Sequence, residues 1–305
     1  MVQKTNIEEL LGSFLTNDPE FIKTQHNDKY DAIDPKRFLS ERSKDSTIFI
    51  SGGAKGIGKA IALAFAETKA KNIIITSRDK SALKPTKEEI NAISPDTNVI
   101  TLSINVSDGE SVKKAFEEIS QHVDKIDVVI NNAGTTAALM TTEDPEKWWG
   151  VQETNCKGTV LIAGHALPLL KKSKNPVIIN TSSCASQLVY GGWSCYSTSK
   201  VFVNKYTEYL DVEYRKDLNL KAVAYHPGGI KTELATDKNV VDEEFLKLLV
   251  DEPGLPASFC VWFAYSPDSE FLSGRFVSAK WDVDELIANK DLIISKKLFK
   301  TKVDL

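Results

Sequence analysis

A tyrosine and a lysine four residues apart, Tyr196 and Lys200, are the side chains whose spacing most directly suggests chemistry. In a helix this spacing places both residues on one face, where they can share a ligand. A phenol in water has a pKa of about 10, and a nearby ammonium group lowers this pKa because it favours the phenolate. Tyr196 could therefore exchange a proton near neutral pH. Taken alone, the pair could also be a surface aromatic residue beside a solvated lysine.

Ser183 is a second candidate, thirteen residues before Tyr196 and shortly after the apolar run at residues 177–180. A hydroxyl group at the end of a strand can hold a substrate oxygen and stabilise the negative charge that develops on it. The presence of this serine upstream makes the tyrosine–lysine pair a stronger candidate for a catalytic site than the pair is alone.

A glycine-rich stretch, residues 51–58 with the sequence SGGAKGIG, is the candidate anion-binding element. It follows the apolar run 48–50 and precedes a helical pattern at residues 59–67, so it is predicted at a strand-to-helix turn. Glycine allows the sharp turn and a close approach of pyrophosphate, and the first N–H groups of a helix favour an anion. The spacing Gly-x-x-x-Gly-x-Gly differs from the general dinucleotide fingerprint Gly-x-Gly-x-x-Gly, and such a turn can also occur without a ligand.

Seven short apolar runs alternate with helical patterns over most of the chain. Runs of this kind, bounded by turn residues, are typical of strands that are buried on both faces. Alternation with helices implies right-handed crossovers and a parallel sheet. We therefore predict an α/β fold, a doubly wound parallel β-sheet (Rossmann fold) of about seven strands with helices on both faces. The predicted strands lie at residues 48–50, 72–76, 99–104, 126–130, 177–180, 222–225 and 274–278, and the predicted helices include residues 111–122, 145–170 and 194–216.

The chain is divided by this pattern into one domain with a flank on each side. The Rossmann-fold domain is predicted at residues 46–280, after a polar N-terminal extension (1–45) and before a C-terminal tail (281–305). Residues 7–15 could form a short amphipathic helix within the extension. The polar and glycine-rich segments follow the strands, and the carboxyl ends of parallel strands lie at one edge of a sheet. A ligand site is therefore predicted at that edge.

Composition excludes several classes of protein. Of the 305 residues, 42% are hydrophobic and 26% are charged, as is ordinary for a globular protein with a full core. A net charge of −4 gives no support for nucleic-acid binding, and no apolar run approaches the ~20 residues that a membrane span needs. No secretion or transit pattern is evident, so a cytoplasmic location is expected. The four cysteines and four histidines show no metal-ligand spacing, and no metal site is predicted.

Several motifs together resemble the short-chain dehydrogenase/reductase family, and in particular its single-domain, NADP-preferring type. The motifs span roughly 180 residues in the expected order. Residues 26–35 also look like the N-terminal flank of some fungal members. Two departures are small: Ser51 stands where Thr is usual, and Asn105 stands where Asp is usual. The matching motifs are residues 51–58, residues 131–134 (NNAG), Asn155, Ser183, Tyr196 with Lys200, and residues 227–232 (PGGIKT).

The resemblance implies hydride transfer between a nicotinamide and a carbonyl or alcohol carbon. It assigns Tyr196 as the general acid for reduction, Ser183 as the group that holds the substrate oxygen, and Lys200 as a partner of the tyrosine and of the nicotinamide ribose. Asn155 would keep a water near the lysine for proton relay; otherwise it would be a polar residue that kinks a helix. The residues implied in cofactor binding are Gly52, Lys55, Gly56, Ile57, Gly58, Ser77, Arg78, Asn105, Val106, Asn132, Ala133, Gly134, Tyr196, Lys200, Pro227, Gly228, Ile230 and Thr232.

The residues after the second predicted strand favour NADP(H) as the cofactor. NAD-specific sites place a carboxylate there for the ribose 2′-hydroxyl, whereas an Arg accommodates a 2′-phosphate. This chain has Ser77 and Arg78, with Lys55 in the glycine turn as a second cation. A guanidinium group pairs well with phosphate. The alternative is that both cations are merely solvated.

Three stretches are expected to line the substrate side: residues 135–149, 184–195 and 229–256. The second is mostly apolar and aromatic, and residues 242–250 of the third form an amphipathic pattern that could act as a helical lid. Apolar walls favour a ketone or aldehyde of some bulk. His226 is interpreted as a neighbour of the cofactor loop rather than a catalyst, and Trp148 and Trp149 as packing residues.

The sequence as a whole predicts an NADPH-dependent carbonyl reductase that acts on a small molecule. One alternative is an NAD(P)-linked alcohol or polyol dehydrogenase. Another, from a different class, is a non-catalytic dinucleotide-binding sensor or scaffold, which would have no need of the Tyr196–Lys200 pair. The family resemblance implies a homodimer or homotetramer.

Overall fold

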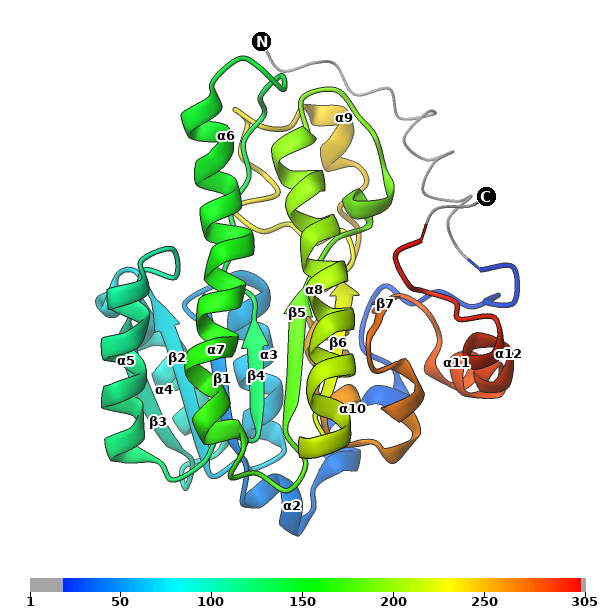
Figure 1. Cartoon of the computed structure of the whole chain (residues 1–305). Coiled ribbons are helices and arrows are strands. Elements are labelled where there is room, and N and C mark those ends of the chain that lie inside the picture. Colours follow the sequence, from blue (N-terminus) through cyan, green and yellow to red (C-terminus); the bar gives the residue numbers. More distant parts are fainter. Residues whose placement is uncertain (1–18, 303–305) are drawn as a thin grey trace.

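The computed structural model describes residues 19–302, so the helix predicted at residues 7–15 lies outside the described residues. One parallel sheet of seven strands runs through the described chain in the order β3-β2-β1-β4-β5-β6-β7 (Figure 1). The predicted fold class is confirmed, and each predicted strand is present. The strands are β1 (Thr47–Ser51), β2 (Asn72–Ser77), β3 (Asn98–Ser103), β4 (Val128–Asn131), β5 (Val177–Thr181), β6 (Lys221–His226) and β7 (Arg275–Ser278).

The strand order reverses between β1 and β4. The chain moves outward from β1 to β3 and then returns to pair β4 with the other edge of β1, where Ile50 lies opposite Ile130. A reversal of this kind opens a crevice at the carboxyl ends of the two strands, which is where open α/β sheets bind ligands. The glycine-rich turn follows β1, so the topology alone places it at this crevice.

Helices cover both faces of the sheet, because each strand has apolar residues on both sides. Ile48 and Ile50 belong to the core on one face, whereas Phe49 between them belongs to the core on the other. In Figure 1, α5, α7 and α8 lie in front of the sheet. The first core includes α3 (Gly56–Glu67), α4 (Lys84–Ile93) and α10 (Gly254–Tyr265); the second includes α5 (Gly109–His122), α7 (Gly158–Leu170) and α8 (Ser194–Leu218).

The long helix predicted at residues 145–170 is present, but it contains a turn of π-helix. It consists of α6 (Pro145–Gln152), the π turn η4 (Glu153–Lys157) and α7. Asp144 caps its start by accepting a hydrogen bond from the Lys147 N–H at 3.0 Å, and Pro145 occupies the first turn. A π turn inserts an extra residue and is frequent at functional sites.

The helix predicted at residues 242–250 is much shorter than expected. Only α9 (Glu243–Leu246) is α-helical, with Asp242 accepting from the Phe245 N–H at 2.9 Å. The following N–H groups of Leu248 and Leu249 bond to carbonyls three residues back, and the chain then turns toward Asp251. The amphipathic pattern predicted a helix over the whole of residues 242–250, so its helical extent was overestimated. The action of this segment as a lid stays a prediction.

The described parts of both flanks pack on the core of the domain. Ile22 and Ile33 share one core cluster with Leu286 of α11 (Val283–Ala288) and Ile293 of α12 (Lys290–Ser295). Figure 1 shows the N-terminal segment (blue) beside α11 and α12 (red). The division into a domain at residues 46–280 with two flanks stays a prediction. Within residues 19–302, no helix combines the length and hydropathy needed to cross a lipid bilayer. The shorter helices are η1 (Asp31–Ile33), η2 (Pro35–Phe38), α2 (Glu41–Lys44), η3 (Lys80–Leu83), η5 (Cys184–Gln187) and η6 (Pro267–Leu272).

Candidate active site

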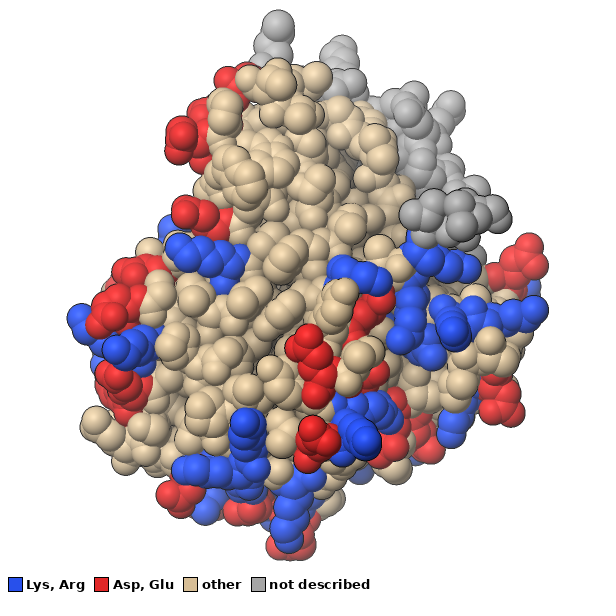
Figure 2. Space-filling view, in the orientation of Figure 1, with Lys and Arg blue, Asp and Glu red and all other residues tan. Residues whose placement is uncertain are grey.

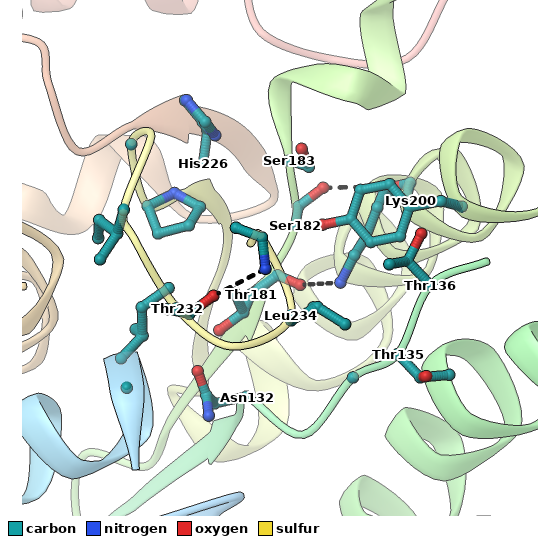
Figure 3. A pocket seen from close by; sticks show the side chains of 18 of the residues that line it. Asn132, Thr135, Thr136, Thr181, Ser182, Ser183, Lys200, His226, Thr232 and Leu234 are labelled. Atoms are coloured by element: carbon teal, nitrogen blue, oxygen red, sulfur yellow. Dashed lines mark hydrogen bonds between the residues drawn. The ribbon is translucent and has the colours of Figure 1, made fainter. Parts of the chain in front are cut away.

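A cavity of about 1220 Å³ runs along the carboxyl ends of the strands (Figure 3). Its volume exceeds the ~300–1,000 Å³ that is usual for a small-molecule pocket, so it has room for a dinucleotide and a second molecule. The cavity is lined by residues from every segment that the sequence assigned to the site. Of the predicted site residues, Gly58 and Asn155 alone are absent from its lining.

The glycine-rich turn has the shape that an approaching pyrophosphate requires. Gly52 and Gly56 have φ angles of +71° and +56°, which disfavour residues with a side chain. A Cβ atom on Gly58 would overlap the Gly52 carbonyl and lie 2.6 Å from Asn132 Nδ2. Lys55 is the N-cap of α3 and makes no side-chain capping bond, so within the described chain no side chain caps this helix start. The residues present therefore fit a dinucleotide phosphate.

Ser51 and Asn132 fix the turn to the neighbouring strand end. Ser51 Oγ accepts hydrogen bonds from the N–H groups of Asn132 and Ala133, both at 3.0 Å. Asn132 Nδ2 in return donates to the carbonyls of Ser51 (3.1 Å) and Gly52 (3.3 Å). The serine that replaces the usual threonine thus retains the hydroxyl that joins β1 to β4 at the reversal of strand order.

The two cations predicted to select the cofactor both line the cavity. Arg78 is exposed after β2, and Lys55 is exposed in the glycine turn. Lys55 Nζ forms an ion pair with Glu233, a residue beyond β6 that the sequence did not connect with it. The pair joins the glycine turn to the segment that follows Thr232, and both of its residues line the cavity.

The proton-transfer candidates converge at the inner part of the cavity. Lys200 Nζ donates to the Thr181 carbonyl at 2.8 Å and lies 5.4 Å from the centre of the Tyr196 ring (Figure 3). Ser183 Oγ accepts from the Ala185 N–H at 3.1 Å, which fixes it at the end of β5. The helix α8 and the strand end thus bring together three side chains that the sequence separates by up to seventeen residues.

Burial dominates the pKa values of this pair. It raises the pKa of Tyr196 to about 12, although hydrogen bonding to Ser183 acts in the opposite direction. Burial also lowers the pKa of the Lys200 ammonium to about 8. The lower tyrosine pKa that the four-residue spacing predicted is therefore not found in this structure, because desolvation of the phenolate outweighs the hydrogen bond with Ser183. Tyr196 is therefore protonated at neutral pH and carries the proton that a general acid would donate, but a phenol with this pKa releases it less readily than one with a pKa of about 10.

Asn155 lies in the π turn, where it joins two neighbouring segments. Its Oδ1 accepts from the Thr135 N–H, and its Nδ2 donates to the Thr135 carbonyl and to Ser199 Oγ, each at 2.9 Å. The side chain is 1% exposed. Asn155 therefore holds the loop after Gly134 against α8; its assignment to a proton relay stays a prediction.

Aromatic side chains enclose the substrate side of the cavity. Trp193 contacts Tyr190 edge to face, with ring centres 5.7 Å apart, and Phe245 of α9 in the same manner at 5.2 Å. This cluster connects residues 184–195 to the segment predicted as a lid. Trp148 donates from Nε1 to Ser194 Oγ at 3.0 Å, which confirms its predicted packing role, while Trp149 is 62% exposed.

The lining residues that the sequence analysis did not connect with the site include Gln25, Lys280 and Trp281. They come from the N-terminal segment and from the chain just after β7, and Gln25 forms an isolated β-bridge with Trp281. The fungal-like flank at residues 26–35 was the signal that could have directed attention to this region.

His226 lines the cavity, and its Nδ1 atom is buried with no hydrogen-bond partner among the described residues. Burial, with a smaller contribution from the charge of Lys280, lowers its pKa to about 3. The ordinary value is about 6.5, so at pH 5 the unfolded chain binds a proton that the folded chain excludes. This difference should reduce the free energy of unfolding by about 2 kcal/mol between pH 7 and pH 5.

His226→Gln should remove that loss, because glutamine cannot be protonated. Urea unfolding at pH 7 and pH 5 measures the difference, and His122→Gln, which changes an exposed histidine of α5, is the control. If the free energy of unfolding of His226→Gln falls between pH 7 and pH 5 by as much as that of the unaltered chain, the assignment of a neutral, buried imidazole is contradicted.

Comparison with known proteins identifies a family. The short chain dehydrogenase family model matches residues 46–242. Short chain dehydrogenase mpl6 of Monascus purpureus is 33% identical over 290 residues, covering 93% of this chain and 96% of that protein. Short chain dehydrogenase pigC of Monascus ruber is 30% identical over 292 residues, covering 93% and 94%. A short chain dehydrogenase structure from Shigella flexneri, complexed with NADP, has a TM-score of 0.68 and 24% identity, covering 80% of this chain and 99% of that one.

Proposed function

The chain belongs to the short chain dehydrogenase family, and on that premise we propose that it is an NADPH-dependent carbonyl reductase. The observation that carries the proposal is the convergence of Ser183, Tyr196 and Lys200 on one cavity that also contains the glycine turn. A cofactor-binding scaffold without catalysis would need the turn but not these three side chains.

Ser183, Tyr196 and Lys200 each have a separate role in the reduction. Bound NADPH supplies the hydride. The Ser183 hydroxyl donates a hydrogen bond to the carbonyl oxygen and stabilises the charge that develops there. Tyr196, with its pKa raised to about 12, is protonated at neutral pH and donates the proton. Lys200 is held against the Thr181 carbonyl, beside the tyrosine ring. When the cofactor is bound, Lys200 would hydrogen-bond its nicotinamide ribose.

The preference for NADPH over NADH rests on two cations and on the absence of a carboxylate at the position after Ser77. Arg78 and Lys55 both line the cavity at its glycine-turn end. Both can pair with a 2′-phosphate, which carries the charge that a guanidinium group binds best. The NADP complex of the Shigella flexneri protein, which has the same fold, agrees with this preference.

The substrate class follows from the aromatic enclosure. Leu188, Trp193 and Phe245 favour a ketone or aldehyde with a bulky apolar group. A panel of ketones, aldehydes and diketones with NADPH, followed by the loss of nicotinamide absorbance, tests the function. Consumption of NADPH with bulky apolar carbonyls is expected. Turnover of alcohols alone would establish the dehydrogenase alternative, and cofactor binding without turnover in either direction would establish the scaffold.

An uncharged area over α7 and the upper part of α8 supports a homo-oligomer. Figure 2 shows this tan area, with charged side chains around it and over the lower part of α8. Exposed apolar residues of α8 include Phe202 (41%), Tyr209 (55%) and Val212 (70%). A face of this kind on a folded chain is typical of an interface. The cytoplasmic location stays a prediction.

Light scattering should therefore give a mass of two or four chains, and Val212→Glu should lower it by burying a charge in the interface. Val250→Glu, which changes an exposed valine outside these helices, should leave the mass unchanged. A monomeric unaltered chain would contradict the proposal.

A further inference from the structure

The segment between β6 and α10 leaves the site and returns to it at one point. Residues 227–230 follow β6, and the chain comes back at Asp251, whose N–H donates to the Gly229 carbonyl at 3.0 Å. The Gly229 N–H donates in the opposite direction to Asp251 Oδ2 at 2.6 Å, and Ile230 forms a β-bridge with Asp251. The intervening residues 231–250, which include α9, thus form a loop that is closed at its base.

Asp251 makes this closure with a buried charge. Its side chain is 2% exposed, and its second oxygen, Oδ1, pairs with Nζ of Lys280, which is 19% exposed and follows β7. A buried carboxylate requires such a partner, because an unpaired charge in the interior is strongly unfavourable. The ion pair therefore ties the base of the loop to the edge of the sheet.

The N-terminal segment completes the arrangement. Asn27 Oδ1 accepts from Lys280 Nζ at 2.8 Å, and the Asn27 carbonyl accepts from the Glu252 N–H at 2.7 Å. The His26 N–H donates to the Lys280 carbonyl at 2.8 Å. Residues 26 and 27 thus contact the segment that contains Asp251 and the segment that contains Lys280, so the N-terminal flank forms part of the site.

The Asp251 carboxylate packs closely against residues 228 and 229 of the loop. Gly228 has a φ angle of +99°, and a Cβ atom there would lie 2.8 Å from Asp251 Oδ2. A Cβ atom on Gly229 would lie 2.6 Å from the Leu248 carbonyl oxygen. Because packing is this close, a displacement of Asp251 must be transmitted to residues 227–230.

We propose that Asp251, Lys280 and Asn27 form a clamp that positions residues 227–230 for the nicotinamide half of the cofactor and fixes the base of the loop 231–250. The inference rests on the proposed function, in which Pro227, Gly228 and Ile230 contact the cofactor. Asp251 and Lys280 act through that loop and are positioning residues. The glycine turn and Arg78, which would hold the adenosine half, have no part in the clamp.

The clamp predicts that its loss weakens binding of the nicotinamide half alone. In Asp251→Asn, the dissociation constant of NADPH should rise on the order of 10- to 100-fold, because the ion pair with Lys280 that holds the base of the loop in place is lost. Adenosine 2′,5′-bisphosphate, which lacks the nicotinamide, should bind as it does to the unaltered chain. Both constants are measured by titration calorimetry on the full chain.

Two further variants make the experiment decisive. Asp251→Asn with Lys280→Met removes both charges and so spares the fold, and it should show the same selective loss. Asp127→Asn is the matched control: this carboxylate is 13% exposed, pairs with Lys125 at 3.2 Å and accepts from the Thr47 N–H at the opposite edge of the sheet. It should lower stability and leave both dissociation constants unchanged.

The outcomes distinguish a failure of the proposed function from a failure of the clamp. If the unaltered chain binds neither NADPH nor the bisphosphate, the proposed function is overturned. If it binds both and the clamp variants weaken them equally, or weaken neither, the function stands and the clamp is refuted. Selective loss of NADPH binding in both clamp variants supports it.

Discussion

Tyr196→Phe should reduce kcat for carbonyl reduction by about 10²- to 10⁴-fold, because the hydroxyl that donates the proton is removed. The aromatic ring remains, so the packing of α8 and the binding of NADPH should change little. The measurement is the rate of NADPH consumption with a carbonyl substrate from the panel, together with a fluorescence titration of NADPH.

Tyr206→Phe is the matched control for this experiment. Tyr206 lies on the same helix and stacks on Phe202 with ring centres 5.9 Å apart, and burial raises its pKa to about 12 as well. It does not line the cavity. If the two variants retain similar activity, Tyr196 is not the general acid and the enzymatic proposal fails at its central step.

Arg78→Asp should weaken NADPH binding by about 10- to 100-fold, because an attractive charge beside the 2′-phosphate is replaced by a repulsive one. NADH binding should be unchanged or improved, since a carboxylate at this position can accept a hydrogen bond from the ribose 2′-hydroxyl. The ratio of kcat/KM for the two cofactors is therefore expected to move toward NADH.

Lys80→Asp separates this local effect from a change in overall charge. Lys80 is exposed two residues further along and does not line the cavity, so the substitution alters the net charge equally. It should leave the cofactor ratio unchanged. If Arg78→Asp weakens NADPH binding and NADH binding equally, the guanidinium group does not bind the 2′-phosphate.

The sheet could be predicted from the sequence because its signals are local. A strand buried on both faces must be apolar along its length, as β1 and β2 are, and each such run ends at a polar or glycine residue. The start of α6 also has a local signal, because Asp144 is its N-cap and Pro145 occupies its first turn. Parallel topology then brings all strand ends to one edge, which is why motifs far apart in the sequence were expected at one site.

Features that depend on contacts between distant segments could not be predicted in this way. The helix after Asp242 ends early because the chain must return to Gly229, and nothing within residues 242–250 encodes that partner. The Lys55–Glu233 and Asp251–Lys280 ion pairs join residues separated by whole elements. The part of Gln25 in lining the cavity follows from the packing of the N-terminal segment beside β7.

The sequence by itself determined which residue types stand at the strand ends, and hence the family, the fold and the chemistry that Ser183, Tyr196 and Lys200 can perform. Tertiary structure decided how those groups ionise. Spacing along a helix places an ammonium group near a phenol, but burial, which raises the pKa of Tyr196 to about 12 and lowers that of Lys200 to about 8, depends on every segment that encloses the pair. Solvation is a property of the whole fold, and for that reason no local motif could specify it.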